Sequence, residues 1–125
     1  AFTGARIYPG DGPPIANGVL VIRAGKIVAV GGPDTAIPAG SELIDATGKV
    51  LIPGLVDTHS HIGIFGRPGV SANADGNEGS GPVQSSLRAI DAINPQDASF
   101  RIALAGGITT ANIMPGSGNV IGGQT

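Results

Sequence analysis

The only two histidines of the sequence, His59 and His61, stand one residue apart at the end of a short apolar stretch. In an extended segment, alternate side chains project to the same side, so both imidazoles would face one point. Two imidazole nitrogens placed in this way can hold one divalent cation at about 2.0–2.1 Å each. Asp57 shares their parity, and its carboxylate could lie beside the ligands or orient an imidazole. The pattern predicts a metal site.

A His-x-His pair also has an ordinary explanation, since two histidines on a surface or in a core need no ion. The position of this pair favours the metal site. It ends the apolar strand predicted at residues 55–59, where a strand–helix order begins. Parallel α/β folds carry their chemistry at the carboxyl ends of such strands.

The composition excludes several other kinds of function. The 125 residues carry a formal net charge of −2, so no nucleic-acid-binding surface is expected. The absence of cysteine excludes disulfide scaffolds, thiolate zinc sites and cysteine nucleophiles. No apolar run approaches the roughly 18 residues of a membrane span, and no signal-peptide pattern is visible. The compartment stays open, with the cytoplasm slightly favoured and a processed secreted form as the alternative.

Residues 1–53 have the pattern of β-structure. Short β-branched runs alternate with glycine-containing turns, which predicts an opening strand followed by two hairpins. The strands are expected at residues 5–8, 19–22, 27–30, 42–46 and 49–52. Because so small a sheet needs a second sheet to cover it, this region is predicted to be part of a β-sandwich.

Residues 54–125 have a different pattern, in which strands alternate with helices. The strand at 55–59 is followed by a glycine-rich loop at 63–81, whose length indicates a functional loop. An apolar stripe with helical spacing covers residues 83–93. Asn94 is expected to cap a second helix over residues 95–105, which ends at Gly106. A strand at 108–114 completes a βαβ unit with two parallel strands.

A resemblance to the metal-dependent amidohydrolase superfamily rests first on residues 53–61, whose sequence is PGLVDTHSH. Three further segments resemble its imidazolonepropionase-related branch: residues 91–95 (DAINP), 106–110 (GGITT) and 115–124 (PGSGNVIGGQ). The resemblance covers essentially the whole chain. It implies the N-terminal part of a small β-sandwich at 1–53, followed by the first βαβ unit of a (β/α)8 TIM-like barrel at 54–125.

The resemblance also implies a function. His59 and His61 would bind the more buried metal of a hydrolase, most often zinc, with one or two ions per site. A metal-activated water would hydrolyse a C–N bond of a small molecule, in an amide, a cyclic amide or a related group. The other ligands and the general base are expected outside this chain, so the chain alone is expected to be inactive.

The missing parts of such a site would come from the rest of the barrel, as a second chain or a missing segment, and a homo-oligomer is also open. Two other functions remain as alternatives. One is an aminohydrolase (deaminase) of the same superfamily, and the other is a non-catalytic fragment or binding module.

Polar residues in two loops are candidates for contact with the substrate, because these loops follow barrel strands on the catalytic face. Glu78 is the main candidate in the first loop, and Asn119 and Gln124 are those in the second. Their neighbours Asp75, Asn77 and Ser117 share these positions. The alternative is that all of these side chains only hydrogen-bond within glycine-rich turns.

Overall fold

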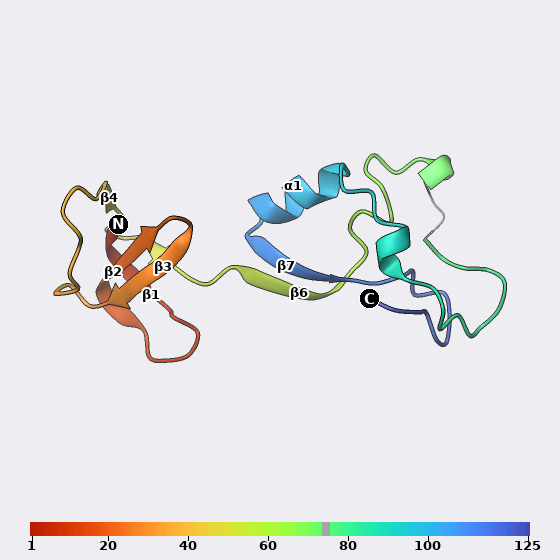
Figure 1. Ribbon diagram of the computed structural model, residues 1–125, viewed down its shortest axis with the longest axis horizontal. Helices are drawn as coiled ribbons and strands as arrows, with labels where there is room; N and C mark the ends of the chain where they lie inside the picture. The colour runs from red at the N-terminus through yellow and green to blue at the C-terminus, as the bar shows by residue number, and fades with distance from the viewer. Residues whose placement is uncertain (74–75) are drawn as a thin grey trace. The chain divides into compact units, whose positions relative to one another are not determined.

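The polypeptide divides into two compact units, residues 1–53 and 54–125. A computed structural model describes residues 1–73 and 76–125 (Figure 1). The first unit is built from strands, and the second combines strands with one α-helix. None of the helices in these described ranges has the length and apolar content needed to cross a membrane.

The first unit is a five-stranded sheet in which β1 is central. Its strands are β1 (Phe2–Ile7), β2 (Ile15–Arg23), β3 (Lys26–Gly31), β4 (Ile44–Asp45) and β5 (Val50–Leu51). The predicted hairpin of β2 and β3 is confirmed, with Arg23 paired to Lys26 across a two-residue turn. Both turn residues, Ala24 and Gly25, have positive φ, as tight hairpin turns that match the strand twist require.

The second predicted hairpin is wrong, because β4 and β5 do not pair with each other. Both lie parallel to β1, with Ile44 opposite Phe2 and Val50 opposite Arg6. The chain between them turns locally, where Lys49 N donates to Ala46 O at 2.9 Å, and then resumes its direction. The free edge of β1 thus binds both short strands in succession.

The core of the first unit is small and formed by Ala5, Ile7 and Ala46. Several aliphatic side chains of the same sheet stay exposed, among them Ile27 at 65% and Val28 at 54%. Part of the apolar surface of this sheet is therefore left uncovered.

The second unit contains the predicted βαβ arrangement. Strand β6 (Leu55–Ser60) pairs in parallel with β7 (Ile108–Ile113), and α1 (Ala98–Ala105) lies between them in sequence (Figure 1). The long segment after β6 contains only two 3₁₀ turns among its described residues, η1 (Ser71–Asn73) and η2 (Ala89–Asp91).

The helix predicted from the apolar stripe at residues 83–93 is wrong. Val83 and Arg88 form parallel bridges with Ile121 and Gln124 instead. The backbone N–H of Ala89 donates to the carbonyl of Gln124 at 2.9 Å, so this segment takes hydrogen bonds from a distant partner. Helical spacing in the sequence could not reveal that partner.

The helix α1 begins three residues later than predicted. Asn94 accepts a hydrogen bond from Gln96 N at 3.0 Å and so forms a turn, while Asp97 is the N-cap and accepts from Ser99 N at 2.8 Å. Asp97 is buried and also accepts from Arg67 N at 2.6 Å. The same carboxylate therefore caps α1 and holds the loop after β6. The predicted end of the helix at Gly106 is confirmed.

This cap predicts a pH dependence of stability. Hydrogen bonds from Ser99, and then from the Arg67 backbone, lower the pKa of Asp97 below its ordinary value. A carboxyl group with a lowered pKa in the folded state stabilises that state above its unfolded pKa of about 4 and loses this contribution as the pH falls. Urea unfolding between neutral pH and pH 3 should therefore show a smaller loss of stability on acidification for Asp97→Asn than for the wild type. Equal losses in both proteins would contradict the assignment.

Candidate metal centre

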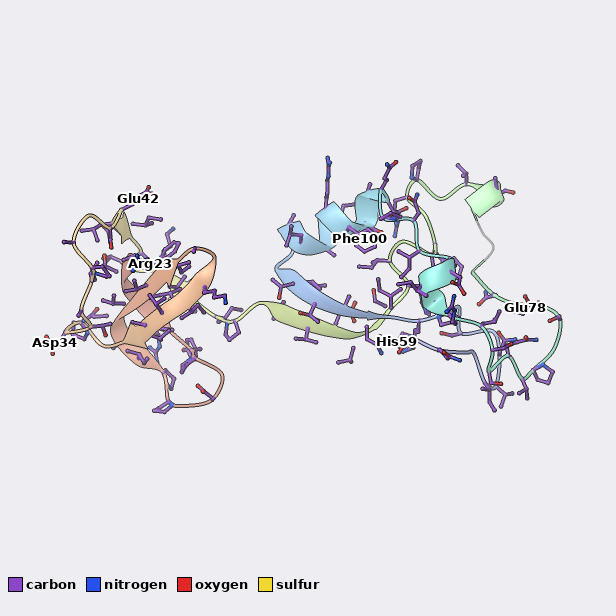
Figure 2. The ribbon with its side chains drawn as sticks, in the orientation of Figure 1. Arg23, Asp34, Glu42, His59, Glu78 and Phe100 are labelled. Carbon is purple, nitrogen blue, oxygen red and sulfur yellow. The ribbon has the colours of Figure 1, made fainter. Side chains whose placement is uncertain are left out.

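The two histidines lie where β6 ends, in the second unit. His59, labelled in Figure 2, is the penultimate residue of β6. His61 directly follows the strand. Their rings meet edge to face, with centroids 5.2 Å apart and planes at 90°. The alternation of the strand thus brings both imidazoles to the same side, as predicted.

A backbone carbonyl fixes the orientation of the His61 ring. Its Nδ1 lies 2.8 Å from the carbonyl oxygen of Met114. A carbonyl only accepts hydrogen bonds, so Nδ1 carries the proton and Nε2 keeps its lone pair. Met114 is held in place because its own N–H donates to Ser60 O at 2.9 Å, which continues the ladder between β6 and β7. Metal-binding histidines are commonly oriented by a hydrogen bond of this kind.

The free nitrogens of both rings converge on one place. The hydroxyl oxygen of Ser117 lies 3.2 Å from His61 Nε2 and 3.5 Å from His59 Nε2. Both Nε2 atoms therefore face a common point at the end of the parallel strands. Two nitrogens with this convergence fit the donor preference of a divalent cation such as zinc.

The described residues supply an incomplete ligand set. No group of three His, Cys, Asp or Glu side chains suitable for a metal occurs in residues 1–73 and 76–125. Catalytic zinc sites have three protein ligands as a rule. The two imidazoles would need donors from elsewhere.

Asp57 is placed next to the pair but is oriented toward the backbone. Its carboxylate accepts a hydrogen bond from the backbone N–H of His59 at 3.2 Å. In the part of the chain that the structure describes, no hydrogen bond joins it to either imidazole ring. Its predicted role as the anion that orients a ring stays a prediction, and the carbonyl of Met114 provides that orientation for His61.

The loop candidates form hydrogen bonds with residues of the same two loops. Asn119 Nδ2 donates to the carbonyls of Glu78, at 2.8 Å, and Gly81, at 2.7 Å. The Glu78 carboxylate accepts from Ser80 N at 2.7 Å, and hydrogen bonds from the Ser80 hydroxyl and backbone lower the pKa of Glu78 (Figure 2). Gln124 Nε2 donates to Ser85 O at 3.3 Å. These contacts match the turn interpretation, while contact with a substrate stays a prediction. Asp75 lies outside the described residues.

Sequence reasoning missed the carbonyl of Met114 and the proximity of Ser117 to both rings. The available signal was the parallel order of the two strands, whose carboxyl ends must share one edge. Gly116 brings Ser117 to this edge, because it lets the loop after β7 approach the loop after β6 closely. Its N–H donates to Gly76 O at 2.7 Å, and a Cβ at this position would collide with that oxygen and with Asn77 Oδ1. Only glycine allows the two loops to approach this closely.

Comparisons with known proteins decide the family. No family model matches the chain. The amidohydrolase tasK of Hapsidospora irregularis is 37% identical over 109 residues, which are 86% of this chain. A crystal structure of an amidohydrolase from Thermotoga maritima matches 98% of the chain with a TM-score of 0.83 and 40% identity. The chain belongs to the amidohydrolase superfamily.

The chain matches only part of each of these amidohydrolases. It spans 11% of the length of the tasK protein and 31% of the Thermotoga maritima chain. A shorter similarity joins it to a 5'-deoxyadenosine deaminase of Methanococcoides burtonii, with 48% identity over 50 residues, which are 40% of this chain and 11% of that protein. The chain is thus similar both to amidohydrolases and to a deaminase.

The contacts of Asn119 generate a prediction about the loops beside the metal centre. Asn119→Asp keeps the size of the side chain but removes the two donors and turns a carboxylate toward two carbonyl oxygens. We expect a loss of about 2 kcal/mol in the free energy of unfolding, since each hydrogen bond contributes about 1 kcal/mol. Hydrogen exchange of residues 78–84 should accelerate. Gln96→Glu makes the same chemical change at an exposed position and should alter neither quantity. An unchanged exchange rate in Asn119→Asp would show that the two hydrogen bonds of Asn119 are not needed to order residues 78–84.

Proposed function

We propose that this chain provides two metal ligands, His59 and His61, to a hydrolase that acts on a C–N bond of a small molecule. The observation that carries the proposal is the convergence of the two Nε2 atoms, with His61 Nδ1 engaged by the Met114 carbonyl. The superfamily to which the chain belongs is generally metal-dependent. When bound, a divalent ion would polarise the attacked bond and lower the pKa of water.

The residues of this chain have defined tasks in the proposal. His61 binds through Nε2, because its Nδ1 proton is engaged by the carbonyl of Met114. His59 binds through Nε2 from the same side of the strand. The hydrogen bond from the His59 backbone to Asp57 keeps the end of β6 in shape. Parallel pairing with β7 holds both ligands at the carboxyl edge, where the loops can admit a substrate.

We propose zinc as the ion, since imidazole is among its preferred ligands, although iron, nickel and copper accept the same donors. Further ligands and the general base would come from other parts of the barrel. The exposed side chains of Leu55 and Val56 on β6 and Ile102 on α1 support the same proposal, because they leave apolar surface that further barrel elements would cover.

The deaminase relative favours a second candidate, an aminohydrolase. The two activities differ in their products. An amidohydrolase would release a carboxylate from N-acyl amino acids or cyclic amides, whereas an aminohydrolase would release ammonia from aminopurines. Assay against both classes, with the rest of the barrel present, separates them. A protein with neither metal nor turnover would be a non-catalytic fragment or binding module.

The ligand assignment predicts the behaviour of two variants. His59→Asn and His61→Asn each remove one of the two nitrogens, so we expect zinc content after dialysis to fall to background. Any turnover should fall by more than about 100-fold, beyond the loss typical of residues that only support a ligand. Elemental analysis and the assays above provide the measurements.

Thr58→Ala is the matched control, because Thr58 directly precedes His59 in β6 and neighbouring side chains of a strand project to opposite faces. It should keep both metal and turnover. Full metal content in His59→Asn or His61→Asn would refute the ligand assignment, whatever the substrate proves to be.

A further inference from the structure

We propose that Ser117 is a positioning residue of the metal centre, whose hydroxyl holds the two imidazoles convergent and adjoins the bound ion. The inference rests on the proposed function, because it concerns the same pair of ligands. It is carried by one geometric fact. A single side-chain oxygen lies within 3.5 Å of the Nε2 atoms of both histidines, although 56 or more residues separate it from them in sequence.

The direction of the hydrogen bond between Ser117 and His61 follows from the tautomer of His61. Since His61 Nδ1 carries its proton toward Met114 O, His61 Nε2 can only accept, and the Ser117 hydroxyl donates to it. The same hydroxyl oxygen lies 3.5 Å from His59 Nε2. Both rings are therefore aimed at one oxygen.

Ser117 is the only hydrogen-bond partner of the His59 ring in the described part of the chain. His59 is exposed, so without this contact its ring is free to adopt other rotamers. Two imidazoles that are free to rotate lose conformational entropy when they bind an ion, whereas a pair that is already ordered loses less. Removal of the hydroxyl should therefore weaken metal binding.

The position of Ser117 is itself fixed by the fold. The preceding Gly116 is buried and donates its N–H to Gly76 O at 2.7 Å. The side chain of Asn77 packs closely against both Gly116 and Gly118. The hydroxyl is thus presented from a tightly packed loop. It lies 3.2 Å and 3.5 Å from the two nitrogens that would hold an ion, so the hydroxyl would adjoin an ion bound there.

Cobalt(II) binding to the full chain tests the inference with a readout other than activity. We expect Ser117→Ala to bind Co²⁺ about 10-fold more weakly than the wild type, as is typical when a residue that orients a ligand is lost. Ser117→Thr keeps the hydroxyl and should restore the affinity. The thermal midpoint of the metal-free Ser117→Ala variant should match that of the wild type, which separates positioning from folding.

Ser117→Cys tests whether the site adjoins the ion. A thiolate there should bind Co²⁺ and produce a sulfur-to-cobalt charge-transfer band in the near ultraviolet. Thr58→Cys is the matched control, because it places a thiol on the opposite face of β6, and it should give no band. An unchanged affinity in Ser117→Ala, or no band in Ser117→Cys, overturns the inference.

The outcomes distinguish this inference from the proposed function. If the wild type binds no Co²⁺, or if His61→Asn binds it as well as the wild type, the ligand assignment fails and the role of Ser117 fails with it. If the wild type binds Co²⁺ through the histidines but the Ser117 variants behave like the wild type, only the role of Ser117 fails.

Discussion

The parallel pairing of β6 with β7 is the constraint on which the candidate site depends. Ser60 lies opposite Ile113, and the N–H of Met114 donates to Ser60 O, so the two strands end at the same level. Because parallel strands run in the same direction, the loops that follow them leave from one edge. The carbonyl of Met114 can reach His61 only from this register. A shift by one residue would turn the next side chain, and not His61, toward it.

Contacts between the two loops hold them in place where they leave this edge. The loop after β7 approaches the loop after β6 closely at Gly116, and Asn119 binds the carbonyls of Glu78 and Gly81. Further along, the backbone of residues 83–89 takes its partners from residues 121–124. Segments without regular secondary structure are thus ordered by contacts with each other. This accounts for a well-defined position of Ser117 within a glycine-rich turn.

The two units bury little apolar surface for their composition. No large side chain is fully buried in the described ranges, and Val56, Ile102 and Leu104 are each more than 60% exposed. Burial of apolar surface stabilises folded proteins by about 25 cal/mol per Å². Covering these exposed side chains would therefore stabilise the fold further. The chain matches 31% of the length of the Thermotoga maritima amidohydrolase. Sheets of two strands are rarely stable without additional cover.

The sequence by itself determined the features that depend on neighbouring residues. The β2–β3 hairpin follows from its turn residues, the end of α1 follows from Gly106, and the common side of the two histidines follows from strand alternation. The PGLVDTHSH segment indicated the superfamily, which the relatives confirm. Each of these is local, because the chemistry or the signature lies within a few adjacent positions.

The tertiary structure decided the features that depend on partners far away in the chain. β4 and β5 both pair with β1 because its edge is available to them, and Val83 and Arg88 form β-bridges because Ile121 and Gln124 lie opposite them. Asp97 caps α1 in place of Asn94 while it also binds Arg67 N. The convergence of Ser117 with both imidazoles is of the same kind. Backbone N–H and C=O groups form hydrogen bonds with the partners that the fold brings close to them. Those partners cannot be predicted from the spacing of residues along the chain.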